Sequence, residues 1–202
     1  MATLPATETV TGPALRPLLG EIARLRIAVF RGFPYLYDGD ADYEERYLAR
    51  YAESPGAAIV LAREGGQIIG AATCLPLAAA GEAVLAPFRA RGLDAARFCY
   101  FGESVLLAPW RGRGFGVAFF AAREAQARRV PGCEEACFCA VQRPADHPAR
   151  PAGYIPLDAF WRKRGYTPDP GLVCEMAWKE VGAAADSAHR LGFWRKPLTG
   201  TP

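Results

Sequence analysis

One segment, residues 98–129, limits most strongly what this chain can fold into. An apolar run over residues 98–107 is followed by Pro109, by a turn with three glycines, and by a helical pattern from residue 114 onward. Glycine adopts backbone conformations that are closed to other residues and lets a ligand approach the main chain closely. A strand that leads through such a turn directly into a helix is typical of mixed α/β folds. The segment therefore predicts a strand, a glycine-rich turn and a helix in that order.

The turn has the chemistry of an anion-binding site. The unpaired N–H groups of the turn and of the first helical turn converge on one point, and the positive end of the helix dipole reinforces them. Arg111 and Arg113 add positive charge beside that point. The expected ligand is a phosphate or a pyrophosphate.

Two common phosphate-binding patterns do not fit this turn. A P-loop requires a lysine after its last glycine, and this turn has none. The dinucleotide fingerprint, Gly-x-Gly-x-x-Gly, requires a small residue at Val117, and it usually opens the first βαβ unit of a domain. A third pattern, Arg/Gln-x-x-Gly-x-Gly/Ala, fits Arg111, Gly114 and Gly116.

The rest of the chain predicts a partly antiparallel sheet flanked by helices. Apolar runs on both sides of Glu64-Gly65-Gly66 indicate a hairpin, and Asp42 is expected to cap the second helix. The element order is β-α-α-β-β-β-α-β-α-β-β, in a single domain over residues 1–202. The expected strands are residues 8–11, 57–62, 67–75, 98–107, 134–141, 172–181 and 189–196, and the expected helices are residues 15–30, 42–53, 114–129 and 157–164, with a short helical candidate at 83–90.

Composition excludes several classes of protein. Of the 202 residues, 51% are hydrophobic and 22% are charged, which argues against a disordered chain. No run approaches the roughly 18 apolar residues of a membrane span, and no secretory signal is visible, so we expect a cytoplasmic protein without a membrane partner. The net charge of +3 is too small to indicate nucleic-acid binding. Six cysteines match no zinc-binding spacing, so we expect reduced thiols and no metal.

The charges are distributed unevenly along the chain. Residues 105–129 contain five arginines and one glutamate, whereas residues 38–45 contain five carboxylates and no basic residue. A basic zone and an acidic zone suggest two different ligands. Two solvated surfaces are the alternative.

Two signatures resemble those of the GCN5-related N-acetyltransferase (GNAT) superfamily. Residues 107–116, LAPWRGRGFG, are similar to the family's apolar-x-Pro-aromatic-Arg-Gly-x-Gly-x-Gly signature, and residues 159–166, AFWRKRGY, are similar to its Phe-Tyr-x-x-x-Gly-Phe signature. The expected order of strands and helices follows the family fold over nearly the whole chain. The resemblance implies a mixed, mostly antiparallel seven-stranded sheet flanked by about four helices.

The resemblance also implies acetyl-CoA as co-substrate. Its pyrophosphate would be held by backbone N–H groups of the turn, which consists of Arg111, Gly112, Arg113, Gly114, Phe115 and Gly116. In the family, the strand before the turn carries a bulge and splays from the next strand, and the pantetheine arm lies in that gap. Main-chain groups of Leu106, Leu107 and Ala108 would bind the arm, and an N–H there would polarise the acetyl carbonyl.

Acetyl transfer to an amine requires a base, because a protonated amine has no lone pair. Glu103 lies where many family members place a carboxylate base, and a carboxylate paired with an arginine or a backbone group is the alternative. The family tyrosine that protonates the leaving thiolate is replaced here by Trp161, whose indole N–H is not a usable acid. Tyr154 is the expected substitute, with Tyr166 or solvent as alternatives.

The acceptor is expected to bind between the first two helices, where the family builds part of its acceptor pocket. Residues 33–40, FPYLYDGD, form that loop here. Aromatic rings together with carboxylates suit a cationic amine with an apolar portion. We therefore expect Tyr35, Tyr37 and Asp38 to contact the acceptor, and the alternative is that the aspartates only form turns and a cap.

Together these features predict an N-acetyltransferase in which a small-molecule amine attacks acetyl-CoA directly in a ternary complex. Transfer of a longer acyl group is one alternative. A catalytically impaired acyl-CoA sensor or interaction module of the same fold is another. The C-terminal strand pair could join a dimer sheet, so a homodimer stays open.

Overall fold

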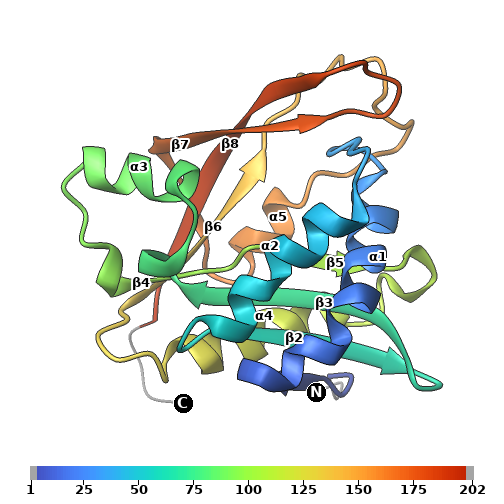
Figure 1. The fold of residues 1–202 in the computed structure, drawn as a ribbon. Coiled ribbons are helices and arrows are strands. Elements are labelled where there is room, and N and C mark those ends of the chain that lie inside the picture. The colour runs from blue at the N-terminus through green and yellow to red at the C-terminus, as the bar shows by residue number, and fades with distance from the viewer. Residues whose placement is uncertain (1–3, 199–202) are drawn as a thin grey trace.

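The centre of the computed structural model, which describes residues 4–198, is an eight-stranded sheet (Figure 1). The strand order is β1-β2-β3-β4-β6-β8-β7, and β5 also pairs with β3. Paired strands run antiparallel except β4 and β6, which are parallel. The strands are β1 (Glu8–Val10), β2 (Ala58–Glu64), β3 (Gln67–Pro76), β4 (Phe98–Tyr100), β5 (Ser104–Leu106), β6 (Glu135–Val141), β7 (Thr167–Lys179) and β8 (Asp186–Pro197).

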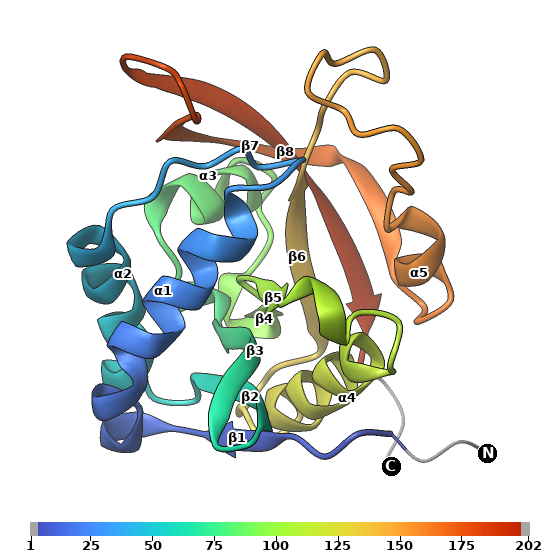
Figure 2. The same cartoon turned by 90° about the vertical axis from the view of Figure 1, so that its right-hand side faces the viewer.

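Helices cover both faces of this sheet. They are α1 (Leu19–Phe30), α2 (Ala41–Glu53), α3 (Glu82–Ala90), α4 (Phe115–Ala127) and α5 (Asp158–Arg162), with short 3-10 helices between some of the elements. Figure 2 shows α1 and α2 on one side of the sheet and α4 and α5 on the other.

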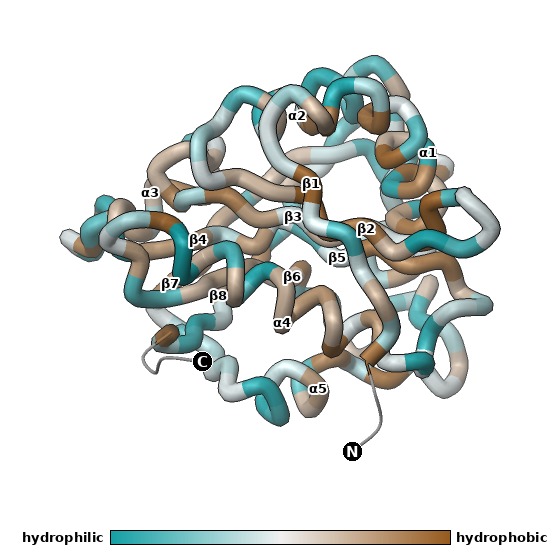
Figure 3. Tube along the Cα trace, turned by 90° about the horizontal axis from the view of Figure 1, so that it is seen from below, coloured by the Kyte–Doolittle hydropathy of each residue, from teal (hydrophilic) through white to brown (hydrophobic). Residues whose placement is uncertain are grey.

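The central strands contribute to hydrophobic cores on both faces of the sheet. Ile59 and Leu61 of β2 pack into the core shared with α1 and α2, whereas Ala58 and Val60 pack on the side of α4. A strand that is buried on both faces shows a continuous apolar run instead of alternation. Hydrophobic colours accordingly follow β2 and β3 in Figure 3, and hydrophilic colours gather on loops and on the outer turns of α2.

The predicted strand over residues 98–107 is in fact two strands, which corrects the strand count from seven to eight. Leu75 of β3 pairs with Tyr100, and Ala72 pairs with Ser104, so three steps along β3 face four steps along the partner. The extra residue is a β-bulge, which bends a strand and redirects its side chains. Before the bulge, β4 pairs with β6, and the bond from Phe101 N to Cys137 O at 2.8 Å continues this pairing. After the bulge, β5 pairs only with β3 in the described chain.

Tertiary contacts hold this break in place. A Cβ at Gly102 would lie 2.5 Å from the hydroxyl of Tyr51, so only glycine fits there. The N–H of Glu103 donates to Thr73 Oγ1 at 3.2 Å, and the buried guanidinium of Arg123 on α4 donates to the carbonyl of Glu103, also at 3.2 Å. The break therefore fixes the backbone of Glu103 from both faces of the sheet.

The structure changes three further sequence predictions. Asp40, and not Asp42, caps α2, because its carboxylate accepts the N–H of Tyr43 at 2.8 Å. β7 begins at Thr167 instead of residue 172, with a register shift between Asp169 and Val173. The candidate at 83–90 does form a helix, α3, which makes five helices instead of about four. The hairpin of β2 and β3 is confirmed.

Within residues 4–198, no helix has the length and apolar character needed to cross a membrane.

Candidate active site

The glycine turn joins β5 to α4 through backbone conformations that require glycine. Gly112 has a φ of 76° and Gly114, the residue before α4, has a φ of 90°. Residues with a side chain rarely adopt this left-handed region. A Cβ at Gly114 would also lie 3.1 Å from Cδ of Pro5. The two glycines thus allow the chain to turn from the sheet into the helix over a very short distance.

The turn presents a row of free backbone donors. Among the described residues, the N–H groups of residues 112–116 have no hydrogen-bond acceptor. Arg111 and Arg113 are exposed beside them, and the guanidinium of Arg113 lies 4.7 Å from the ring centre of Trp110. Free donors at a helix N-terminus, flanked by two cations, are suited to a phosphate group.

Main-chain groups of β5 face the gap left by the splayed strands. The N–H of Leu107 donates to Ile69 O at 3.0 Å within the sheet. Since hydrogen bonding alternates along an antiparallel ladder, the N–H and C=O of Leu106 point away from β3. The carbonyl of Leu106 accepts a bond from Nε of Arg111 at 3.2 Å, and the carbonyl of Ala108 accepts from the N–H of Arg111. Of the three residues predicted to bind a pantetheine arm, Leu106 therefore offers both of its main-chain groups on the gap side.

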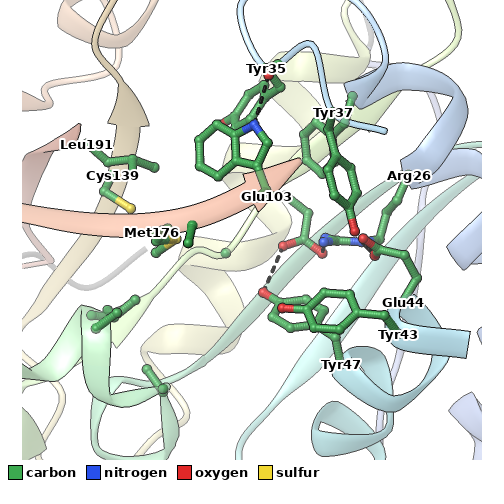
Figure 4. A pocket seen from close by; sticks show the side chains of 18 of the residues that line it. Arg26, Tyr35, Tyr37, Tyr43, Glu44, Tyr47, Glu103, Cys139, Met176 and Leu191 are labelled. Carbon is green, nitrogen blue, oxygen red and sulfur yellow. Dashed lines mark hydrogen bonds and ion pairs between the residues drawn. The ribbon is translucent and has the colours of Figure 1, made fainter. Parts of the chain in front are cut away.

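Glu103 lies just before β5 in a buried group of three charged side chains (Figure 4). Arg26 of α1 forms ion pairs with both Glu103 and Glu44 of α2. The hydroxyl of Tyr47 donates to Glu103 Oε2 at 3.3 Å. Glu103 is thus paired with an arginine, which was the stated alternative to a role as a base. However, two carboxylates share one guanidinium, so the group as a whole has one more negative than positive charge. Its role as a base stays a prediction.

The protonation of the neighbours follows from burial and charge. Burial by itself lowers the pKa of Arg26, but the negative charges of Glu103 and Glu44 outweigh it and raise that pKa well above its ordinary value. Burial, and then the charge of Glu103, raises the pKa of Tyr47. Burial also raises the pKa values of Tyr35 and Tyr37. The guanidinium is therefore charged and the tyrosines are neutral donors near neutral pH.

These groups line a cavity of about 700 Å³ between the sheet, α1, α2 and α3. The predicted acceptor residues Tyr35, Tyr37 and Asp38 all line it. The carboxylate of Asp38 is already paired with Lys179 at 2.8 Å and with Arg31 at 3.1 Å, and the hydrogen bond from Lys179 lowers its pKa. A cavity of this size suits a small organic molecule.

Sequence analysis missed several lining residues, among them Arg26, Glu44, Tyr47 and Trp178. One feature of the sequence could have revealed Arg26. It falls on the apolar face of the first predicted helix, four residues after Ile22. A charged residue on a buried helix face requires a buried partner.

The candidate general acids do not join Glu103 in the cavity. Tyr154 lies outside the lining residues, with its ring 4.7 Å from that of Phe33, and burial raises its pKa. Tyr166 is fully buried and donates to Glu124 at 3.1 Å. Trp161 packs against Phe138 with ring centres 5.1 Å apart. The role of Tyr154 stays a prediction.

Comparisons with known proteins agree with this geometry. A family model described as "Acetyltransferase (GNAT) family" matches residues 23–166. No curated protein sequence matches significantly. Among solved structures, a ribosomal-protein-alanine N-acetyltransferase from Brucella melitensis is 15% identical with a TM-score of 0.60, covering 95% of this chain and 99% of its own.

Two further solved structures contain acetyl-CoA or coenzyme A. A Salmonella typhimurium protein with its cofactor acetyl-CoA is 14% identical with a TM-score of 0.58, covering 97% of this chain and 96% of its own. An aminoglycoside 6'-N-acetyltransferase complexed with coenzyme A is 12% identical with a TM-score of 0.56, covering 98% and 99%. At these identities the likeness shows the shared fold. With the family model matching most of its length, the chain belongs to the GNAT acetyltransferase family.

Proposed function

We propose that this protein transfers the acetyl group of acetyl-CoA to a small-molecule amine by direct attack in a ternary complex. The observation that carries the proposal is the position of Glu103. It lies at the bulge, so it borders both the cavity and the start of the splayed strand β5. A reaction between a molecule in the cavity and one held along β5 would take place beside this carboxylate.

The donor half of the site supports acetyl-CoA as the co-substrate. The free amides of residues 112–116, with Arg111 and Arg113, would hold the pyrophosphate. The N–H and C=O of Leu106 would bind the pantetheine arm, and the Leu106 N–H is the candidate donor to the acetyl oxygen as negative charge develops on it.

Charge balance supports Glu103 as the group that accepts the proton of the amine. Arg26, Glu44 and Glu103 together carry two negative charges and one positive charge. When Glu103 takes a proton, Arg26 and Glu44 remain as a balanced pair, so no buried charge is left alone. The freed lone pair attacks the acetyl carbon, a C–N bond forms and the C–S bond breaks. The second proton that the nitrogen loses passes to the leaving thiolate, either directly or through Tyr154 or water.

One observation favours a second candidate function. Trp161, which stands at the position of the family's acidic tyrosine, is packed between aromatic rings and offers no acidic proton. The same fold could therefore bind acyl-CoA as a sensor without efficient transfer.

A thiol-release assay separates the two candidates. The protein is incubated with acetyl-CoA and a panel of primary amines, and the products are identified by mass spectrometry. Amine-dependent release of thiol with formation of an N-acetyl product supports the transferase. Binding of acetyl-CoA with no release for any amine supports the sensor. In double-reciprocal plots of initial velocity with both substrates varied, a ternary complex predicts intersecting lines. Parallel lines would exclude it.

A further inference from the structure

The cavity has two chemically different ends. One end holds Glu103, Arg26, Glu44 and the ring of Tyr47, and the other is lined by Cys139, Met176 and Leu191 (Figure 4). In the close view, Arg26 and Glu44 lie on one side of Glu103, and Cys139, Met176 and Leu191 lie on the other. A molecule that fills the cavity must therefore satisfy both a charged and an apolar surface.

The charged end has room for one positive charge. The group of Arg26, Glu44 and Glu103 is one cation short of neutrality. The other cations that line the cavity are engaged elsewhere, because Lys179 pairs with Asp38 and Arg50 lies on the ring of Tyr47, 4.6 Å from its centre. An ammonium group beside Glu103 would balance the buried charge.

The apolar end offers little to a polar ligand. Its side chains come from five elements: Leu75 of β3, Val84 of α3, Cys139 of β6, Met176 of β7 and Leu191 of β8. The hydroxyl of Tyr100, which also lines the cavity, is already bonded to Sγ of Cys139 at 3.2 Å. The carboxylates that line the cavity besides Asp38, Glu44 and Glu103 are all exposed to solvent, namely Asp40, Glu82, Glu175 and Asp186. A second ammonium or a carboxylate placed among the five apolar side chains would therefore lose its water without gaining a buried partner. An aliphatic or aromatic group would instead remove apolar surface from water.

We propose that the acceptor is a primary amine with a single positive charge and an uncharged apolar group. Its ammonium lies beside Glu103, and its apolar group lies among Val84, Cys139 and Met176. The claim that this amine is acetylated rests on the proposed function. The proposal excludes polyamines and free amino acids as preferred substrates.

Calorimetric titration of the full-length protein with matched amines tests this proposal. From ethylamine to pentylamine, each methylene should tighten binding about fourfold, or about 60-fold in all, because burial of a methylene contributes about 0.8 kcal/mol. Pentylamine should bind at least tenfold more tightly than cadaverine, which adds a second ammonium at the apolar end. It should also bind at least tenfold more tightly than norleucine, whose carboxylate lies beside the ammonium and cancels the positive charge that the charged end requires. Equal or tighter binding of cadaverine or norleucine would overturn the proposal, as would the absence of any gain with chain length.

A pair of variants places the apolar group. Met176→Ala should weaken pentylamine binding about five- to tenfold and change ethylamine binding less than twofold. Val181→Ala also truncates an apolar side chain, but Val181 is exposed and does not line the cavity. This variant should change the binding of neither pentylamine nor ethylamine. If Met176→Ala and Val181→Ala behave alike, the apolar group does not lie where we place it.

The same amines in the thiol-release assay separate failure of this inference from failure of the proposed function. If short, long and doubly charged amines are acetylated equally well, acetyl transfer stands and the acceptor class is wrong. If pentylamine binds with the expected preference but is never acetylated, the ligand class stands and acetyl transfer is wrong. If no amine binds or reacts, both are wrong.

Discussion

The substitution Glu103→Gln removes one negative charge from the buried group of Arg26, Glu44 and Glu103 and keeps the shape of the side chain. Arg26 and Glu44 then remain as a balanced ion pair, so the free energy of unfolding should change by no more than about 1 kcal/mol. Gln cannot accept the proton of the amine. Loss of a general base reduces rates about 10²- to 10⁴-fold, which corresponds to about 3–5 kcal/mol of transition-state free energy.

Steady-state kinetics over a range of pH measure this effect. At each pH at which the wild type is active, kcat/KM should be lower by this factor in Glu103→Gln. Glu44→Gln is the matched control, because it removes the same charge from the same guanidinium at a greater distance from β5. We expect kcat/KM of Glu44→Gln to fall less than about tenfold, because Glu44 affects the reaction only through Arg26. A wild-type rate and pH profile in Glu103→Gln would mean that Glu103 only pairs with Arg26.

Two other outcomes follow from the same group and from the aromatic loop. Arg26→Met leaves Glu44 and Glu103 buried together without a cation, so it should destabilise the fold by about 3–5 kcal/mol near neutral pH. Protonation of the carboxylates removes that repulsion. The difference in unfolding free energy between the variant and the wild type, measured in urea, should therefore shrink as the pH is lowered, and a constant difference would contradict the charge argument. Tyr154→Phe should lower kcat and leave KM for the amine unchanged if Tyr154 protonates the thiolate, and an unchanged kcat would leave that step to solvent.

The parts of the site whose conformation depends on residues adjacent in the chain could be predicted from the sequence. Gly112 and Gly114 adopt positive φ for reasons local to the turn, and the free amides follow directly from the start of α4. The hairpin around Gly65-Gly66 was predictable for the same reason.

The break between β4 and β5 could not be predicted in this way. Residues 98–107 form a nearly continuous apolar run because the strand is buried on both faces. The interruption at Gly102 depends on the hydroxyl of Tyr51 and the guanidinium of Arg123, which come from α2 and α4. Local propensity carries no information about such contacts.

The charged group of the cavity was hidden for a similar reason. Arg26 and Glu44 lie 18 residues apart and meet only because α1 and α2 pack on the same face of the sheet. The sequence placed the acidic residues near the acceptor loop, but Asp38 proved to be paired with Lys179 at 2.8 Å. The two buried carboxylates that share a single cation are Glu44 and Glu103.

Calorimetric titration with acetyl-CoA tests most directly whether the turn at residues 111–116 is the donor site. The wild type should bind one acetyl-CoA per chain, and Gly114→Val should bind it at least about tenfold more weakly, because a side chain at φ 90° destabilises this backbone by about 1–2 kcal/mol and meets Pro5. Gly132→Val introduces the same strain at φ 76° in an open turn after α4 and should bind like the wild type. No binding by the wild type, or equal binding by Gly114→Val and Gly132→Val, would contradict the assignment.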